Sequence, residues 1–189
     1  MVVRCPAVLS YDVGERMAGL MDAGFSRKEV LRMASRWPPV LRKSSQNKVL
    51  MLQQAGLSRA AAIKAVQEYP RLLGYNVEKR IVLLVNAGFQ RDQVLKMVRL
   101  HPNVLGLDVA ARLALLAATG FTPAQALKMA ATFPQVLSLD VNKRVQLLQA
   151  EGFSRDEVLK MVVSLPQVLG MDAEKRIALL LQAGFTKTQ

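Results

Sequence analysis

The sequence predicts an all-α fold, an α-solenoid (superhelix) built from about six repeats of roughly 32 residues each. One observation behind this prediction is spacing: six prolines recur at a constant interval, and a glycine follows each proline at a constant distance. The prolines are Pro6, Pro38, Pro70, Pro102, Pro134 and Pro166, and the glycines are Gly24, Gly56, Gly88, Gly120, Gly152 and Gly184. The other is that apolar residues between these markers follow helical spacing, so each repeat is expected to hold two helices that pack on its neighbours.

The first helix of each repeat is expected to follow position 20, counting the proline as position 0. This position holds residues that are mostly good N-caps: Ser26, Ser58, Gln90, Thr122, Ser154 and Thr186. Glu29 and Glu157 lie three residues after their serines and complete capping boxes. Apolar residues follow at positions 24, 25, 27 and 28, and the helix must end near the next proline, which lacks an N–H.

The second helix is expected after a short Pro-x-Val-Leu link, which we predict to be a 3₁₀ turn. Its cap is a small polar residue: Asp12, Ser44, Asn76, Asp108, Asp140 or Asp172. The apolar stripe occupies positions 7, 11, 14 and 17, and the glycine at position 18 suits a C′ residue with positive φ. Helices of roughly ten residues are unstable alone in water, so neighbouring repeats must supply the packing.

The repeats fill the chain, so we expect residues 1–189 to form a single helical-repeat domain without a linker. The terminal repeats are incomplete, and no capping repeat is recognisable. We therefore expect flanking segments or neighbouring proteins to cover the ends. Residues 1–10 already belong to a repeat, so no transit peptide is visible.

The composition is strongly basic and aliphatic. The 189 residues include 26 Lys and Arg against 14 Asp and Glu, which gives a formal net charge of +12, with a single Cys and a single His. A lone Cys5 excludes a disulfide scaffold, and basic residues interrupt every apolar stretch before it reaches membrane-spanning length. A polyanion, most often a nucleic acid, is the expected partner, and no membrane is expected.

We predict no enzyme, no metal site and no cofactor. His101 precedes Pro102 in a column that also holds Trp37, Tyr69 and Phe133, so it is expected to be a packed residue and not a ligand or base. The glycines are isolated helix terminators, which excludes a phosphate-binding loop. Few aromatic residues are present, at 5%, and this argues against reading single strands by stacking.

The recurring string Gly-Phe-Ser-x-x-x-Val-Leu-Lys-Met-Val-x-x-x-Pro-x-Val-Leu resembles the motif of the mitochondrial transcription termination factor (mTERF) family. It is clearest from Gly88 to Leu105, from Gly152 to Leu169 and from Gly24 to Leu41. The tetratricopeptide, ankyrin and transcription-activator-like effector repeats, which are of similar length, fit less well. The mTERF resemblance implies a left-handed superhelix of α-α-3₁₀ units with a basic concave surface. It also implies work in mitochondria, or alternatively chloroplasts, on organellar DNA or RNA.

Three columns of basic residues are candidate nucleic-acid contacts. Position 26 holds Arg32, Lys64, Lys96, Lys128 and Lys160; position 21 holds Arg27, Arg59, Arg91 and Arg155. Position 10 holds Arg16, Lys48, Arg80, Arg112, Arg144 and Arg176. Position 26 lies opposite the apolar stripe and therefore faces solvent, as a ladder of phosphate contacts or simply as solvated lysines.

The other two columns have competing interpretations. Position 10 lies near the buried stripe, and Asp four residues earlier offers an i, i+4 pair, so a structural role competes with binding. A cation at position 21 opposes the helix macrodipole, so helix stability does not explain it and an anionic ligand could.

The leading hypothesis is a non-catalytic organellar protein that grips the backbone of structured RNA. The RNA would be the rRNA of an organellar ribosome, of which the protein would be a component or assembly factor. The alternatives are a DNA-binding regulator of organellar transcription, acting in termination or initiation, and a protein–protein scaffold. RNA and double-stranded DNA both stay open as partners, as do mitochondrion and chloroplast.

Overall fold

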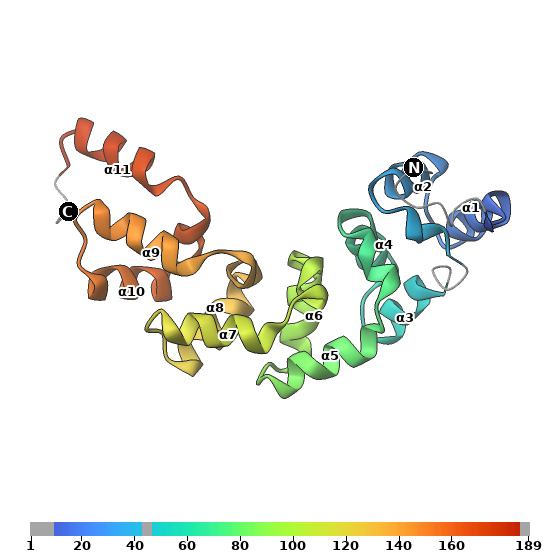
Figure 1. The fold of residues 1–189 in the computed structure, drawn as a ribbon, viewed down its shortest axis with the longest axis horizontal. Coiled ribbons are helices and arrows are strands. Elements are labelled where there is room, and N and C mark those ends of the chain that lie inside the picture. Colours follow the sequence, from blue (N-terminus) through green and yellow to red (C-terminus); the bar gives the residue numbers. More distant parts are fainter. Residues whose placement is uncertain (1–9, 43–46, 186–189) are drawn as a thin grey trace. The chain divides into compact units, whose positions relative to one another are not determined.

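The computed structural model describes residues 10–42 and 47–185, and within these ranges all regular structure is helical. The described residues form the expected series of first α-helix, 3₁₀ turn and second α-helix, which confirms the all-α solenoid of two-helix repeats (Figure 1). The α-helices are α1 (Val13–Asp22), α2 (Arg27–Arg36), α3 (Lys48–Gln54), α4 (Arg59–Glu68), α5 (Val77–Asn86), α6 (Arg91–Leu100), α7 (Val109–Ala118), α8 (Pro123–Thr132), α9 (Val141–Ala150), α10 (Arg155–Ser164) and α11 (Ala173–Gln182). The 3₁₀ turns are η3 (Pro38–Leu41), η5 (Pro70–Gly74), η6 (Pro102–Gly106), η7 (Pro134–Ser138) and η8 (Pro166–Gly170).

The first helices (α2, α4, α6, α8 and α10) begin at the residue after the expected cap. At Ser26 and Ser154 the hydroxyl accepts from the N–H of the glutamate three residues on, and that glutamate accepts from the serine N–H. Thr122 and Gln125 make the same reciprocal pair, and the Gln93 side chain accepts from the Gln90 N–H at 2.9 Å. Glutamine therefore completes capping boxes in this chain as glutamate does.

The second helices (α1, α3, α5, α7, α9 and α11) also begin as predicted, with one difference. The caps Asp12, Asn76, Asp108 and Asp140 each accept from the backbone N–H three residues on. The predicted cap Ser44 lies outside the described residues. Helix α3 begins only at Lys48, and its N-cap Asn47 makes no side-chain capping bond, so α3 has seven residues where the other α-helices have ten.

The hairpin turn between a second helix and the following first helix depends on glycine. All six position-18 glycines have positive φ, between 92° and 115°, and no other residue type has positive φ among the described residues. An L side chain rarely adopts this conformation. At Gly24 and Gly56 a Cβ atom would also lie 2.8 Å from a methyl group of the next hairpin, Ile63 and Leu95 respectively. Glycine at this position therefore allows both the turn and the close packing of successive hairpins.

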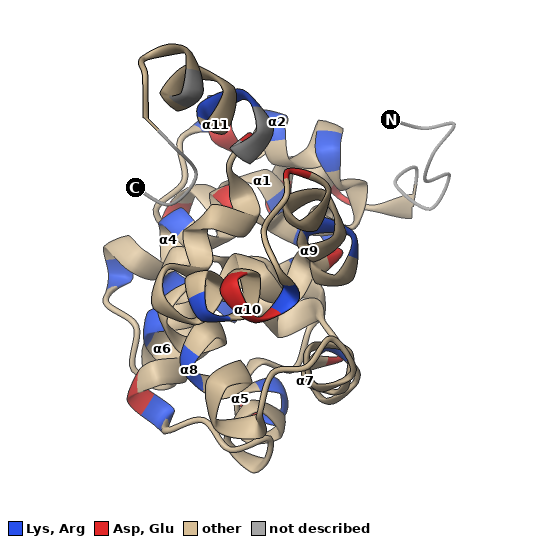
Figure 2. Ribbon diagram, turned by 90° about the vertical axis from the view of Figure 1, so that its left-hand side faces the viewer, with Lys and Arg blue, Asp and Glu red and all other residues tan. Residues whose placement is uncertain are grey.

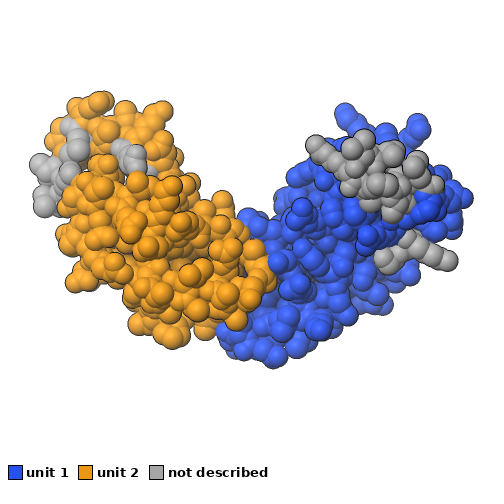
Figure 3. All heavy atoms as spheres, in the orientation of Figure 1, with its two compact units in different colours: residues 1–106 blue, residues 107–189 orange. Residues whose placement is uncertain are grey.

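The chain divides into two compact units: unit 1 is Met1–Gly106 and unit 2 is Leu107–Gln189 (Figure 3). Within unit 1, α4 packs against α6, and the turns contact one another in series, η3 with η5 and η5 with η6. Within unit 2, η7 contacts η8 in the same way. The cores repeat from copy to copy, with the leucine at position 3 after each described proline almost fully buried, as at Leu41, Leu73 and Leu137.

Candidate nucleic-acid interface

The position-26 cations lie on the solvent-exposed sides of the first helices. All five (Arg32, Lys64, Lys96, Lys128 and Lys160) are exposed, because they are opposite the stripe that packs into the hairpin. The Lys64 Nζ lies 3.9 Å from Glu68 Oε1, but the lysine side chain keeps 71% of its surface exposed. The predicted solvent exposure of this column is therefore confirmed, and its role in binding stays a prediction. Figure 2 marks Lys and Arg residues along the ribbons of α4, α6, α8 and α10.

Three further exposed arginines, which belong to none of the predicted columns, lie in a first helix of unit 1 or within three residues of its end. Arg36 follows Arg32 by one turn of α2, Arg99 follows Lys96 on α6, and Arg71 lies in η5 just after Pro70. Because η3, η5 and η6 contact in series, these cations belong to neighbouring layers of unit 1. The repeat pattern does not predict them because they do not recur from one repeat to the next. Arg36 and Arg99 are nevertheless spaced i, i+4 and i, i+3 from the position-26 residues, and this spacing is the signal that finds them.

We call this set the unit 1 basic face: Arg32, Arg36, Lys64, Arg71, Lys96 and Arg99. Within the described ranges, Glu68 is the one acidic side chain that lies within ion-pair distance of any of the six. Exposed cations arranged in this way bind a polyanion without sequence preference, since each phosphate contact releases counterions.

The position-21 arginines contact the preceding hairpin, which the sequence did not reveal. The Arg155 Nη2 donates to the Thr119 carbonyl at 2.7 Å, Arg91 Nη2 to Ala55 at 3.3 Å and Arg59 Nη2 to Asp22 at 3.4 Å. These carbonyls lie at the C-terminal ends of α7, α3 and α1, where the macrodipole is negative and a cation is favourable. The column therefore has a structural reason, because each of these arginines caps the end of a helix in the preceding hairpin.

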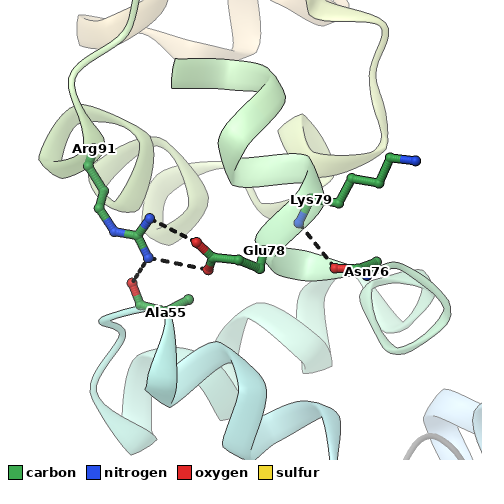
Figure 4. A network of polar contacts seen from close by, with 5 residues as sticks. All are labelled: Ala55, Asn76, Glu78, Lys79 and Arg91. Atoms are coloured by element: carbon green, nitrogen blue, oxygen red, sulfur yellow. Dashed lines mark hydrogen bonds and ion pairs between the residues drawn. The ribbon is translucent and has the colours of Figure 1, made fainter. Parts of the chain in front are cut away.

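Arg91 shows the fullest version of this contact (Figure 4). Its guanidinium also donates to both carboxylate oxygens of Glu78, at 3.0 and 3.3 Å. This hydrogen bond lowers the pKa of Glu78 and raises that of Arg91. Arg27 in the same column is exposed, Pro123 replaces the cation in α8, and Lys187 lies outside the described residues.

The position-10 column is mixed. Arg16, Lys48, Arg80 and Arg112 are half-buried, and Arg144 and Arg176 are exposed. The Arg80 guanidinium lies over the Tyr75 ring, 5.2 Å from its centre, so its head contacts protein.

The Asp–Arg i, i+4 pairs expected in this column do not form among the described residues. The capping aspartates instead accept from the backbone N–H three residues on, as Asp12 does from Glu15 at 3.0 Å and Asp140 from Lys143 at 3.1 Å. Arg16 pairs with Glu15 at 3.4 Å. The carboxylate caps the helix and does not pair with the arginine, because the unpaired N–H groups of the first helical turn lie closer to it than the arginine head does.

Two features of the described residues bear on catalysis and metal binding. His101 is half-buried at the C-cap of α6, and burial lowers its pKa while nearby Glu68 opposes that shift. No group of three or more His, Cys, Asp or Glu residues that could hold a metal occurs within residues 10–42 and 47–185. None of the described helices is long and apolar enough to cross a membrane.

Comparison with known proteins agrees with the repeat analysis. The family model described as mTERF matches residues 1–113 and again residues 82–181, which together cover nearly all of the chain. No curated protein matches the sequence. Proteins of the matched family are generally organellar, bind nucleic acid and are generally not catalytic. The solenoid of two-helix repeats and the family match over most of its length show that this chain belongs to the mTERF family.

Proposed function

We propose that this protein is a non-catalytic, organellar RNA-binding protein that grips the phosphate backbone through the first helices. The observation that carries the proposal is the unit 1 basic face, together with Lys128 and Lys160 at the same repeat position in unit 2. These cations project into solvent, and the Lys64–Glu68 contact is the one ion pair that any of them makes with the described residues. Solvated cations in excess over acids are what backbone binding requires.

We further propose that the RNA is an rRNA and that the protein is a component or assembly factor of an organellar ribosome, most simply that of mitochondria. The second helices of unit 1 support a role inside such an assembly, because they carry large apolar side chains that are exposed to solvent. Leu50 and Met51 on α3 are 55% and 43% exposed, and Val82 and Leu83 on α5 are 44% and 50% exposed. Helices α3 and α5 contact each other, so these residues form one apolar area that neighbouring proteins could cover.

Two other functions use the same surfaces differently. A regulator of organellar transcription would bind duplex DNA through the same cations. Both RNA binding and DNA binding could equally take place in the chloroplast. A protein–protein scaffold would instead use the apolar area of α3 and α5 and would have no need of phosphates. Identifying the nucleic acid and proteins that co-purify with the native protein separates these functions.

The salt dependence of binding tests the proposal directly. If five or more phosphates are neutralised, log K against log[salt] for a structured RNA should have a slope steeper than about −4. The same titration with duplex DNA of equal length ranks the two nucleic acids. A flat slope, or binding to neither, contradicts nucleic-acid binding and leaves the scaffold.

A second experiment asks which column makes the contacts. Changing Lys64, Lys96, Lys128 and Lys160 to glutamine should weaken RNA binding and make the slope shallower by about one per lost contact. Unchanged affinity would move the proposed contacts to the other columns, above all to the arginines Arg27, Arg59, Arg91, Arg155, Arg80, Arg112, Arg144 and Arg176.

A further inference from the structure

Unit 2 contains a groove that its first helices line from both sides. The groove lies between α8 and α10 and has a volume of about 690 Å³, within the range of small-molecule sites. Lys128 and Thr132 contribute from α8, and Lys160 and Ser164 from α10. We call it the α8–α10 groove.

The polar side chains of the α8–α10 groove are arranged in levels along the helices. Lys128 and Lys160 occupy the same repeat position on adjacent first helices, so the groove has one ammonium group from each side. Thr132 and Ser164 lie one helical turn further on, four residues after each lysine. The Thr132 hydroxyl donates to the Lys128 and Met129 carbonyls, at 2.9 and 3.1 Å, which leaves the Ser164 hydroxyl as the donor at this level. The groove therefore offers two cations for phosphate and one hydroxyl for a sugar or a base edge.

An apolar surface and an amide complete the same end of the groove. Leu165 is 48% exposed and lines the groove beside Val163. Gln167 also lines it, and the Gln167 Oε1 is buried without a hydrogen-bond partner. A buried acceptor without a partner is uncommon, and this one belongs to a residue that lines the groove.

The acidic residue of the groove lies at the opposite end. Asp156 precedes Lys160 by one turn of α10 and lines the groove beside Gln125. Its carboxylate repels a phosphate at that end and favours one at the level of the lysines or beyond. The groove consequently has a direction, with the carboxylate at one end and the hydroxyls, amide and apolar wall at the other.

The corresponding first helices of unit 1 lack this lining. Glu68 takes the place of Thr132 and lies 3.9 Å from Lys64, and Leu100 takes the place of Ser164. Helices α4 and α6 also pack directly against each other. The combination of paired lysines with hydroxyls and an amide therefore belongs to unit 2.

We propose that the α8–α10 groove binds one unpaired nucleotide of a nucleic-acid strand. Lys128 and Lys160 hold the phosphate, Ser164 and Gln167 bond the sugar or the base edge, and Leu165 packs on the base. A nucleotide inside a duplex is stacked and paired, so its base edge cannot enter the groove without unpairing. This inference rests on the proposed function and adds that unit 2 prefers single-stranded segments.

The test uses the whole chain and a substitution that fills the groove without changing charge. Ser164→Leu gives α10 the residue that α6 has at the same position, and the reciprocal Leu100→Ser is the matched control; both sites are exposed. Fluorescence anisotropy measures binding to a short unstructured oligoribonucleotide, to the same strand in an RNA duplex, and to the matching single-stranded DNA. We expect Ser164→Leu to weaken single-strand binding at least fivefold and duplex binding less than twofold, and Leu100→Ser to change neither by more than twofold.

The outcomes separate the groove from the wider proposal. Loss of single-stranded RNA and DNA binding together supports a site for phosphate and base, and loss for RNA alone supports a contact to the 2′-hydroxyl. If Ser164→Leu and a second variant, Gln167→Leu, leave single-strand binding unchanged or weaken the duplex equally, the groove proposal is overturned. The proposed function then still stands, provided that the wild-type salt slope is steep. A flat wild-type slope overturns both.

Discussion

Units 1 and 2 share one repeat but differ sharply in charge. Unit 1 has 17 Lys and Arg against seven Asp and Glu, a net charge of +10, whereas unit 2 has nine against seven, a net charge of +2. The position-26 cation is present in every first helix of both. The difference comes largely from positions that vary between repeats, such as Arg36, Arg71 and Arg99.

This contrast separates what the repeat needs from what binding needs. Caps, glycine turns and buried leucines recur in both units because each hairpin must fold and stack in the same way. The charges that differ between the units have no such structural role, and the excess of cations lies in the first helices and the 3₁₀ turns of unit 1. We therefore expect unit 1 to supply most of the affinity for the phosphate backbone and unit 2 to supply the preference for single-stranded over double-stranded segments.

Among the changes that break the difference between the units, the largest expected effect comes from removing three arginines at positions where unit 2 has no cation. Changing Arg36, Arg71 and Arg99 to glutamine together should weaken RNA binding on the order of a hundredfold at about 0.15 M salt, because three phosphate contacts are lost. The slope of log K against log[salt] should become shallower by about two to three.

The control for this triple variant removes the same charge from the second helices. Lys79, Lys143 and Lys175 occupy repeat position 9, on α5, α9 and α11, and are exposed. Their triple change to glutamine should weaken binding far less. Equal losses from the two variants would mean that net charge alone matters and that the unit 1 basic face is not the contact surface.

A smaller effect concerns stability, where we expect the units to behave alike. Arg155→Met in unit 2 removes the 2.7 Å bond to the Thr119 carbonyl and should lower the free energy of unfolding by about 1–2 kcal/mol. Arg91→Met in unit 1 should lower the free energy of unfolding less, because its carbonyl bond is longer and its partner Glu78 is exposed. Urea unfolding measures both, with Lys160→Met as the control; a neutral Arg155→Met would contradict the capping role.

The position-21 arginines also show where sequence reasoning ends. Proline, glycine and cap residues act within one turn of their own backbone, so their spacing predicted the helices, the 3₁₀ turns and the hairpins. The partner of Arg155 is the Thr119 carbonyl of the preceding hairpin, which becomes a neighbour only after the hairpins stack. Helical periodicity predicted the solvent exposure of the position-26 cations correctly. The α8–α10 groove depends on how two helices pack and could not be predicted from either helix alone.

Exchanging one charge between the units gives an effect of about fivefold. Arg71 and Gln135 occupy the same position after their prolines, and both are exposed. Arg71→Gln should weaken RNA binding about fivefold at about 0.15 M salt and Gln135→Arg should strengthen it by a similar factor, one phosphate contact each. If Gln135→Arg has no effect, the strand does not reach η7, and the backbone contacts of unit 2 are limited to its lysines.

The smallest expected effect is a pH dependence of stability that both units should share. Hydrogen bonds from Ser26 lower the pKa of Glu29 in unit 1, and those from Ser154 lower the pKa of Glu157 in unit 2, each below the usual 4.5. A carboxylate with a depressed pKa in the folded protein stabilises it above the unfolded value, and this stabilisation is lost as the pH falls through the folded pKa. Stability should therefore decline below about pH 4.5.

Glu29→Gln and Glu157→Gln should each reduce that decline while keeping the cap, because Gln93 and Gln125 accept the same bond from the N-cap N–H of α6 and α8. Thermal unfolding between about pH 3 and about pH 7 measures the effect, and a slope that differs between the two variants would mean that the two caps are not equivalent.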